Sequence, residues 1–548
     1  MKLARRWQLA ALLVTATLAL VACTLTQEAP KGSVAHIAAT TARVDAQFIR
    51  ANAQTTQDWP SYGLDYGEQR YSKLTQINAD NVKRLGLVWS YEMASVRGVE
   101  ATPLVVDGVM YVTAPWSIVH AIDARTGRKL WVYDPQVPRD KGFKGCCDVA
   151  NRGVALWRGK VFVASYDGRL IALNAATGTK VWERDTIANA KFSYTITGAP
   201  RVFNGKVIIG NGGAEYGVRG YITAYDAETG EQKWRWYTVP GDPSQPFEDA
   251  SMARAAQTWD PAGKWWEAGG GGTAWDTLTF DPELNLMYVG TGNGSPWSRS
   301  KRSPAGGDNL YLASIVALNP DTGQYVWHYQ QTPGDNWDFT STQPMILADL
   351  QINGQPRQVI LHAPKNGFFF VIDRVTGKLI SAKNFTEVNW ATGYDSNGRP
   401  IETPIARSGD RPREIIPSAF GARNCHAMSY NPQTGLVYMP VHNIPMTLMD
   451  NKNWKFNDPQ PFAPHSNMGW NLAVIANAEP PKSAPWGKLV AWDPVKQQAV
   501  WTHQHVSPWN GGTVTTAGNL VFEGTADGRL MAFDARNGRK QWESPTVT

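Results

Sequence analysis

The chain has 548 residues, of which 43% are hydrophobic and 18% are charged, so it can bury a large core. The formal net charge of +6 is small for this length, and Lys and Arg are scattered rather than clustered, which argues against a nucleic-acid-binding function. The 24 tryptophans and 50 glycines favour a repeating β architecture with tight turns over a helical bundle.

The N-terminus reads as an export signal. Lys2, Arg5 and Arg6 precede an apolar run, residues 9–21, that is too short for a comfortable membrane span. The run ends in "LVAC", which resembles a bacterial lipobox and predicts lipidation of Cys23. We therefore expect a lipoprotein signal peptide over residues 1–23 and a lipid-anchored periplasmic protein, with an ordinary cleaved signal as the alternative. The Ala-, Thr- and Gln-rich stretch that follows, residues 24–56, predicts a flexible tether.

A repeat runs through the rest of the chain. Each copy has alternating apolar residues, a turn of the type Asp/Asn-x-x-Thr-Gly, and an outgoing strand that carries Trp. The Trp positions, with Ser381 standing in for one of them and Trp89 in a partial first copy, are Trp131, Trp182, Trp234, Trp327, Trp501 and Trp542. A second hairpin signal precedes most copies, which gives four strands per unit and about eight units. The pattern predicts an all-β, eight-bladed β-propeller over residues 57–548, with the Trp side chains packed between blades.

Two of the four cysteines, Cys146 and Cys147, are adjacent in "KGCCDVANRG". Neighbouring thiols cannot link distant parts of a core, and a disulfide between them strains the intervening peptide, a strain that is seldom kept without a function. Export to an oxidising compartment would allow such a bond to persist.

Several motifs occur together in a fixed order: "DWPSYGLDYGEQRYSKLTQINADNVKRLGLVWSYE", the Cys-Cys stretch, "GNGGAEYGVRGYITAYDAETG", "GGGGTAWD", "GTGNGSPW", "TPGDNWDFTSTQP" and "APKNGFFFVIDR". From about Asp58 to the C-terminus, the chain resembles the quinoprotein alcohol dehydrogenases, which carry pyrroloquinoline quinone (PQQ) on the axis of an eight-bladed propeller. Its loops are more similar to the ethanol-type and quinohaemoprotein branches than to the methanol branch. The resemblance implies oxidation of an alcohol to an aldehyde or ketone.

The resemblance also assigns the residues around PQQ. It implies a Cys146–Cys147 disulfide against one face of PQQ and Trp275 against the other. Arg152 and Lys365 are expected at the edge of this slot, beside the carboxylates and quinone oxygens. Further contacts are implied for Glu100, Thr197, Gly213, Ala214, Thr273, Asn424 and Trp509.

The metal site follows in the same way. Glu215, Asn293 and Asp338 match the family's ligands, and their oxygen atoms suit Ca²⁺. Asp338 also matches the general base, whereas no catalytic role is expected for Asp335. Family members that use a lanthanide carry another carboxylate two residues after the base, where this chain has Thr340, so Ca²⁺ is favoured over a lanthanide.

Three departures from the family pattern are visible in the sequence. No Cys-x-x-Cys-His motif occurs in it, so we expect no covalent haem on these residues and a separate c-type cytochrome or similar protein as electron acceptor. Cys425 stands where relatives usually have Trp, and it is expected to be a free thiol beside the cofactor contact Asn424. Relatives continue past the last Trp with another hairpin, whereas this sequence stops at "WESPTVT", so we expect the last blade to be incomplete.

Two other functions remain open at this point. A non-catalytic propeller lipoprotein acting as an outer-membrane assembly or binding scaffold would share the repeats and the lipobox. A PQQ-binding sensor without catalysis would share the cofactor residues but has no need of Asp338. Which alcohol is oxidised cannot be read from the sequence.

Overall fold

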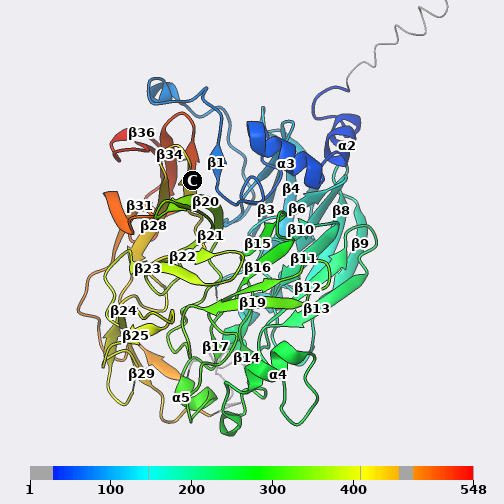
Figure 1. Cartoon of the computed structure of the whole chain (residues 1–548). Coiled ribbons are helices and arrows are strands. Elements are labelled where there is room, and N and C mark those ends of the chain that lie inside the picture. Colours follow the sequence, from blue (N-terminus) through cyan, green and yellow to red (C-terminus); the bar gives the residue numbers. More distant parts are fainter. Residues whose placement is uncertain (1–28, 146, 408, 456–472, 547–548) are drawn as a thin grey trace, which may run out of the picture.

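Figure 1 shows a computed structural model of the protein, which describes residues 29–145, 147–407, 409–455 and 473–546. Cys23 and Cys146 lie outside the described residues, so the predicted lipidation and the predicted Cys146–Cys147 bond stay predictions. Within the described ranges, no helix combines the length and apolar character that a bilayer span requires.

Six four-stranded antiparallel sheets and one five-stranded sheet carry the fold of the described residues. In chain order, the first three four-stranded sheets are β2 to β5 (Leu104–Val106, Val109–Ala114, Ile118–Asp123, Lys129–Tyr133), β6 to β9 (Ala155–Trp157, Lys160–Ala164, Arg169–Asn174, Lys180–Asp185) and β10 to β13 (Arg201–Phe203, Lys206–Gly210, Tyr221–Asp226, Gln232–Tyr237). The next two are β15, β16, β18 and β19 (Leu278–Asp281, Leu286–Gly290, Ser314–Leu318, Tyr325–Gln330) and β20 to β23 (Ile346–Ile352, Gln355–His362, Phe368–Asp373, Leu379–Asn384). The sixth is formed by β27, β28, β31 and β32 (Ser429–Asn431, Leu436–Asn443, Trp486–Asp493, Gln498–His505). The five-stranded sheet has β33 to β36 (Thr513–Thr516, Leu520–Thr525, Arg529–Asp534, Lys540–Pro545) and the N-terminal β1 (Tyr71–Ser72), which pairs with β33 in parallel.

The remaining elements are short. Two small sheets pair β14 (Gly270–Gly271) with β17 (Gly294–Ser295) and β24 (Ala391–Tyr394) with β25 (Pro400–Glu402), and a third joins β26 (Arg413–Ile415), β29 (Met446–Asp450) and β30 (Val474–Ala476). The α-helices are α2 (Val34–Ala42), α3 (Ala46–Thr55), α4 (Ala250–Ala256) and α5 (Arg299–Arg302), and the 3₁₀ turns are η1 (Val82–Arg84), η2 (Pro115–Ser117), η3 (Arg139–Lys144), η4 (Ala214–Tyr216) and η5 (Pro261–Gly263).

The repeated turn explains why each sheet ends in the same hairpin. In the copy between β12 and β13, Asp226 Oδ1 accepts hydrogen bonds from the backbone N–H groups of Glu228 (3.0 Å) and Thr229 (2.9 Å). Gly230 then takes a φ of +70°, which a residue with a Cβ adopts only at a cost. An Asp side chain that caps its own turn, followed by glycine, fixes the direction of the outgoing strand.

The repeated Trp residues join neighbouring sheets, as predicted. Trp131 donates from its indole N–H to the carbonyl oxygen of Ala175 at 3.0 Å, and its ring lies against Gly178 in the turn of the next sheet. The same indole-to-carbonyl contact with the following sheet is made by Trp182, Trp234 and Trp501. Apolar surface is thus buried between one sheet and the next around the molecule.

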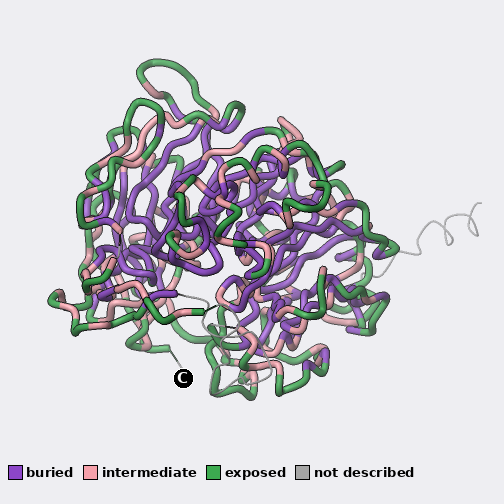
Figure 2. Tube along the Cα trace, turned by 90° about the horizontal axis from the view of Figure 1, so that it is seen from below, coloured by how far each residue is buried: buried purple, intermediate pink, exposed green. Residues whose placement is uncertain are grey.

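The innermost segments of successive sheets are bonded to one another around a common axis. Backbone hydrogen bonds run from Thr102 N to Arg152 O (3.1 Å), from Arg152 N to Thr197 O (2.9 Å) and, across the N- and C-terminal parts, from Thr515 N to Arg70 O (3.1 Å). Seen from below, the buried chain surrounds the centre of the molecule (Figure 2). The all-β propeller-type architecture is therefore confirmed.

The number of eight blades is not confirmed. The segment around Trp89 contains no strand, although its indole N–H bonds Ala124 O at 3.0 Å as in the other units. Leu87 and Val88 beside it are 68% and 85% exposed. The sequence predicts an incomplete last blade, but β33 to β36 form a full set of four antiparallel strands. The incomplete unit is instead the one that contains Trp89.

The tether predicted for residues 24–56 is wrong for residues 34–55, which form α2 and α3. Ile37, Val44 and Ile49 are at most 3% exposed and pack into the cores of the neighbouring sheets. Ser33 and Asp45 cap the two helices by accepting backbone N–H bonds. Apolar residues spaced along the helices outweigh the polar composition that suggested a tether.

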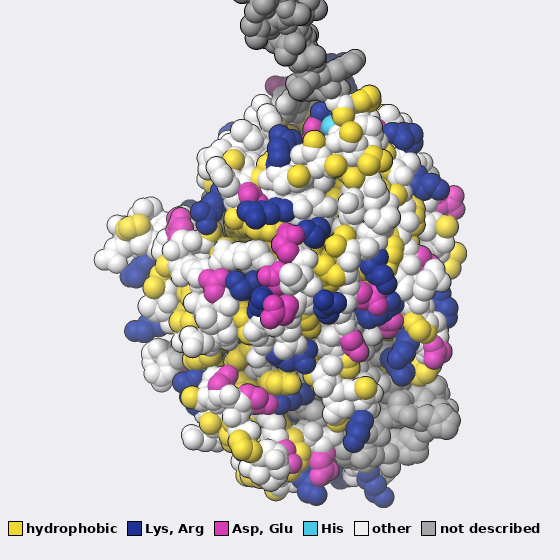
Figure 3. Space-filling model, turned by 90° about the vertical axis from the view of Figure 1, so that its right-hand side faces the viewer, with side chains coloured by type: hydrophobic (Ala, Val, Ile, Leu, Met, Phe, Trp, Pro, Cys, Tyr) yellow, Lys and Arg dark blue, Asp and Glu magenta, His cyan; other side chains and the backbone are white. Residues whose placement is uncertain are grey.

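Surface charge is mixed, as the scattered Lys and Arg residues implied. On the face in Figure 3, Lys and Arg side chains alternate with Asp and Glu side chains, without a large field of one sign.

Candidate functional site

Arg152 follows the Cys-Cys stretch and enters the axial region just before β6. It is 6% exposed, its Nη2 lies 2.8 Å from Glu100 Oε2, and its Nη1 donates to Thr197 Oγ1 at 2.7 Å. Burial lowers the pKa of Arg152 but the Glu100 carboxylate raises it, with a net rise, so the guanidinium stays charged. Three residues assigned by resemblance to the PQQ contacts are thus brought together.

The guanidinium of Arg152 also lies over the ring of Trp275, 4.9 Å from its centroid. This differs from the expectation that Arg152 stands at the edge of the slot. A cation over an indole face is favourable when no other planar group is stacked there. A flat cofactor resting on Trp275 would exchange this contact for its own stacking.

The floor around Trp275 is built by close backbone contacts. Gly272, next to Thr273, donates its N–H to Asn293 O at 2.8 Å. Gly213 has a φ of +108°, and a Cβ there would come within 2.6 Å of Ser193 O, so only glycine fits ahead of Ala214. Turn η4, which follows Gly213, contacts both strands of the small sheet, β14 and β17.

Two of the three predicted metal ligands meet in this contact. Asn293 Nδ2 donates to Glu215 Oε1 at 3.0 Å, and Asn293 is 2% exposed. The third, Asp338, is close enough to Glu215 for the two charges to affect its pKa. The donor set, two carboxylates and an amide oxygen, has the chemistry that Ca²⁺ selects. The Thr340 hydroxyl is already engaged: its Oγ1 accepts hydrogen bonds from Thr342 Oγ1 (3.1 Å) and Gln343 Nε2 (2.9 Å).

Asp338 and Lys365 form a buried ion pair. Lys365 Nζ lies 2.7 Å from Asp338 Oδ2, and the two residues are 6% and 8% exposed. Burial raises the pKa of Asp338 well above its usual range, with Glu215 and Asp335 adding to the rise and Lys365 opposing it. Asp338 has a φ of +65°, a conformation that costs energy for a residue other than glycine and is concentrated at functional sites.

Asp335 caps the turn that precedes Asp338. Its Oδ1 accepts the backbone N–H groups of Trp337 (3.2 Å) and Phe339 (3.0 Å) and so shapes the turn that presents Asp338.

The segment with Cys425 forms another wall. Cys425 is a free thiol, as predicted, and burial raises its pKa, while the charge of Arg152 lowers it. Asn424 donates from Nδ2 to Phe420 O at 3.2 Å. Trp509 packs against His426 and His442, with ring centroids 4.7 and 4.6 Å away. Trp509 therefore adjoins the same segment.

A buried polar group beside the site was not foreseen from the sequence. Asp276, directly after Trp275, is 3% exposed, and the charges of Arg152, Arg201 and Arg70 all act on it. Its only sequence signal is the Asp of "TAWD"; Arg201 and Arg70 lie in motifs that read as strand and turn.

Comparisons with known proteins agree with this geometry. Residues 59–392 and 395–547 match the family described as "PQQ: Glucose/ethanol/alcohol dehydrogenase, beta-propeller domain". A quinohemoprotein alcohol dehydrogenase of Comamonas testosteroni is 69% identical over 520 residues, which cover 95% of this chain and 73% of that protein. A 1-butanol dehydrogenase (cytochrome c) of Thauera butanivorans is 60% identical over 499 residues, 90% of this chain and 71% of that protein.

Solved structures give the same picture. The crystal structure of the Comamonas testosteroni quinohemoprotein alcohol dehydrogenase superposes with a TM-score of 0.93 at 69% identity, over 94% of this chain and 77% of that one. A europium-containing methanol dehydrogenase superposes with a TM-score of 0.81 at 34% identity, over 91% of this chain and 88% of that one.

Proposed function

Because the chain belongs to the PQQ glucose/ethanol/alcohol dehydrogenase β-propeller family, we propose that it oxidises an alcohol to an aldehyde or ketone. PQQ and Ca²⁺ are its cofactors, and the electrons pass to a c-type cytochrome or similar acceptor. The quinohemoprotein and cytochrome c-linked alcohol dehydrogenases among its relatives support this assignment.

One observation carries the proposal: the buried Asp338–Lys365 pair beside the Glu215–Asn293 pair. Asp338 is the general base that accepts the hydroxyl proton of the alcohol, because burial raises the basicity of its carboxylate. Lys365 holds Asp338 in place and supplies positive charge at the edge of the site. PQQ, when bound, supplies the two-electron acceptor that no side chain can provide.

Ca²⁺ would be held by Glu215, Asn293 and Asp338. Their hard oxygen donors suit this ion, and Thr340 adds no negative charge that a trivalent ion would need. Arg152, held by Glu100 and Thr197, would neutralise the cofactor's carboxylates. Trp275 would carry one face of the cofactor, and the Cys146–Cys147 disulfide the other.

Two further proposals concern the rest of the chain. Cys23 is lipidated and anchors the protein in the periplasm, as "LVAC" suggests. Labelled palmitate should enter the wild-type protein and not the Cys23→Ser variant; equal labelling of both would point to attachment at another residue.

The propeller has eight units, because the indole N–H of Trp89 bonds Ala124 O in the same way as the tryptophans of the other units bond their neighbours.

A binding scaffold without a cofactor is the weaker alternative. A scaffold has no use for a buried Asp–Lys pair on a strained backbone next to a carboxylate–amide pair, since each costs stability.

Dye-linked oxidation of a panel of primary, secondary and cyclic alcohols tests the proposed function. We expect dye reduction only when PQQ and Ca²⁺ are both supplied and an alcohol is present. Absence of turnover with every alcohol, in protein that has bound PQQ, would favour the sensor function over the enzyme.

A further inference from the structure

Arg152 and five other buried polar side chains lie near the axis, and we call the six residues the axial column: Tyr62, Glu68, Arg70, Arg152, Arg201 and Asp276. Each is at most 7% exposed. Buried charged residues are rare unless they are paired or used, so a stack of them at the centre of a β protein requires an explanation.

Four members of the axial column contact one another. The guanidinium carbons of Arg201 and Arg70 lie 3.7 and 4.7 Å from the centroid of the Tyr62 ring. Arg201 Nε lies 3.8 Å from Glu68 Oε1. On the cofactor side Arg152 covers Trp275, and the charges of Arg152, Arg201 and Arg70 all act on Asp276 between them.

The column is rich in polar atoms that no protein group satisfies. Among the described residues, both carboxylate oxygens of Asp276, Nε and Nη2 of Arg70, and Nε of Arg152 and of Arg201 have no hydrogen-bond partner. Buried polar groups in proteins are almost always bonded to protein or to ordered water. Water is the partner that fits a set of donors and acceptors facing one another.

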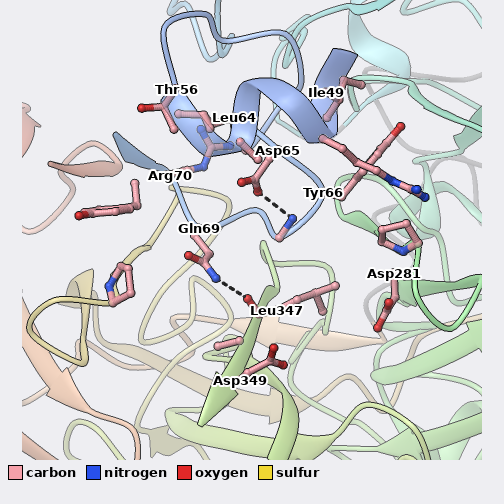
Figure 4. Close-up of a pocket in the computed structure, with 18 of the residues that line it drawn as sticks. Ile49, Thr56, Leu64, Asp65, Tyr66, Gln69, Arg70, Asp281, Leu347 and Asp349 are labelled. Carbon is pink, nitrogen blue, oxygen red and sulfur yellow. Dashed lines mark hydrogen bonds between the residues drawn. The ribbon is translucent and has the colours of Figure 1, made fainter. Parts of the chain in front are cut away.

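The far end of the column opens on a cavity of about 740 Å³. Arg70 lines this cavity together with Gly63, Asp65 and Gln69, and Figure 4 shows Arg70 and Asp65 on the segment that forms its wall. In Figure 1 the cavity elements α3, β1 and β20 lie at the top of the molecule, whereas β14 and β17 of the candidate site lie at the bottom. The column therefore connects opposite ends of the axis.

The backbone that positions Glu68 and Arg70 is strained. Leu64, Glu68 and Arg70 have φ values of +83°, +55° and +49° within one turn. Strain of this kind persists where the surrounding structure enforces a particular side-chain placement. Here it directs a carboxylate and a guanidinium into the axis instead of the solvent.

Oxidation of an alcohol to a carbonyl compound removes two electrons and two protons. In the proposed function, which this inference rests on, the electrons leave one at a time to a cytochrome-type acceptor, so two protons must leave the protein in each cycle. We propose that the axial column is the proton outlet: Asp276 takes a proton through water at Arg152 and passes it to Glu68, from which water beside Arg70 carries it into the cavity.

The electrostatics of the column suit this role. Burial raises the pKa of Glu68 to about 7, against the charges of Arg201 and Arg70, while Asp65 and Asp276 add to the rise. Burial also raises the pKa of Asp276, against Arg152, Arg201 and Arg70 and with Glu100. A carboxyl group with a pKa near the working pH both binds and releases protons readily. The guanidinium groups of the column orient the water.

Proton release during reoxidation of the alcohol-reduced, PQQ- and Ca²⁺-loaded enzyme by a one-electron acceptor tests the proposal, because the protons leave only when the electrons do. A pH-indicator dye follows proton release to solvent, and the cofactor absorbance follows its reoxidation. We expect Glu68→Gln and Asp276→Asn to slow proton release about tenfold or more relative to wild type. Glu68→Asp, which keeps a carboxyl group, should restore much of the rate. The control is Glu523→Gln, a carboxylate that is 1% exposed and bonded by His505 in the C-terminal sheet.

A second readout does not depend on turnover. In loaded protein without alcohol, the infrared C=O band of a protonated carboxyl group should titrate near neutral pH and disappear in Glu68→Gln, but remain in Glu523→Gln. Unchanged proton release in both column variants, or a wild-type band insensitive to Glu68→Gln, would overturn the proposal. Loss of alcohol oxidation in the wild type with the titrating band intact would instead count against the proposed function.

Discussion

Asp338 has three properties that rarely coincide in one residue. It is 8% exposed, it pairs with Lys365 at 2.7 Å, and its backbone has a left-handed φ of +65°. Desolvation of a carboxylate and a strained backbone both cost stability, so the fold must fix this side chain through its neighbours. Such an arrangement is typical of a catalytic base.

Replacing Asp338 by Asn should therefore reduce turnover by about 10²- to 10⁴-fold, because the amide cannot accept the hydroxyl proton. Folding should survive, since Asn can still accept a hydrogen bond from Lys365. Steady-state dye reduction with a saturating alcohol measures the effect.

Asp335→Asn is the matched control, three residues earlier in the same turn. Its Oδ1 can still accept the N–H groups of Trp337 and Phe339, so turnover should stay within about threefold of wild type. Equal losses in the two variants would show that the turn, and not the carboxylate of Asp338, is required.

Sequence motifs were sufficient to name Arg152, Glu100 and Thr197 as neighbours, and the structure places them in contact. They were not sufficient to place the Arg152 guanidinium over Trp275. A long, charged side chain has many rotamers, and its position depends on whichever aromatic faces and carboxylates surround it in three dimensions.

At the scale of elements, the Trp of one repeat packs against the Gly in the turn of the next repeat. Trp131 packs on Gly178 of the following turn, and Trp327 packs on Gly377 in the same way. Where the Trp is replaced by Ser381, the following turn also lacks its Gly and carries Gln497 at a φ of +54°. The two positions therefore change together, because the glycine makes room for the indole ring of the preceding unit.

Gly178→Ala should destabilise the protein by about 1–3 kcal/mol more than Gly205→Ala. Both glycines have a φ near +70°, at +72° and +71°, so the backbone cost is shared. A Cβ at Gly178 would come within 2.6 Å of the Trp131 ring, whereas one at Gly205 meets nothing within 4 Å. Urea unfolding of the two variants measures the difference, and equal stabilities would contradict the docking role of the glycine.

Ion pairs and hydrogen bonds to Asp107 attach the N-terminal helix α2 and the residues just before it to the first sheet. Lys31 Nζ lies 2.7 Å from both carboxylate oxygens of Asp107, and His36 Nε2 lies 3.0 Å from Oδ2. The hydrogen bond from Lys31 is the largest cause that lowers the pKa of Asp107, to about 2. Composition alone could not reveal this attachment, because Asp107 lies in a distant hairpin turn.

Acid should release α2 before the sheets unfold. The folded pKa of Asp107 lies below the value of about 3.9 for an unfolded chain, so its contribution to stability is present above pH 4 and is lost as the pH falls toward 2. Hydrogen exchange, corrected for intrinsic rates, should show α2 losing protection over this range. In Asp107→Asn the protection should be low and independent of pH; retained, pH-sensitive protection in that variant would contradict the assignment.

On the scale of the whole molecule, the repeat predicted the propeller because each unit contains its own turn and docking residues. The unit of Trp89 differs, since its segment has no partner strands among the described residues and leaves Leu87 and Val88 exposed. The Trp89 segment therefore carries the Trp of a repeat unit but not its four strands. Ring closure is a non-local property that no single repeat encodes.

The axial column could not be predicted for a related reason. Glu68, Arg201 and Asp276 come from segments that are far apart in the sequence, and each is read locally as part of a turn or strand. Only the packing of successive sheets around a common axis brings them together, and desolvation there raises the pKa of Glu68 to about 7.

Tryptophan fluorescence tests most directly whether the axial site binds PQQ together with a divalent cation. Titration of PQQ into the protein with excess Ca²⁺ should quench the fluorescence in a saturable way with one PQQ per chain, since Trp275 is the proposed face of the site. Chelation of Ca²⁺ should weaken the binding at least tenfold, as should Glu215→Gln. Quenching that does not saturate, or that is the same with chelator and in Glu215→Gln, would contradict the account.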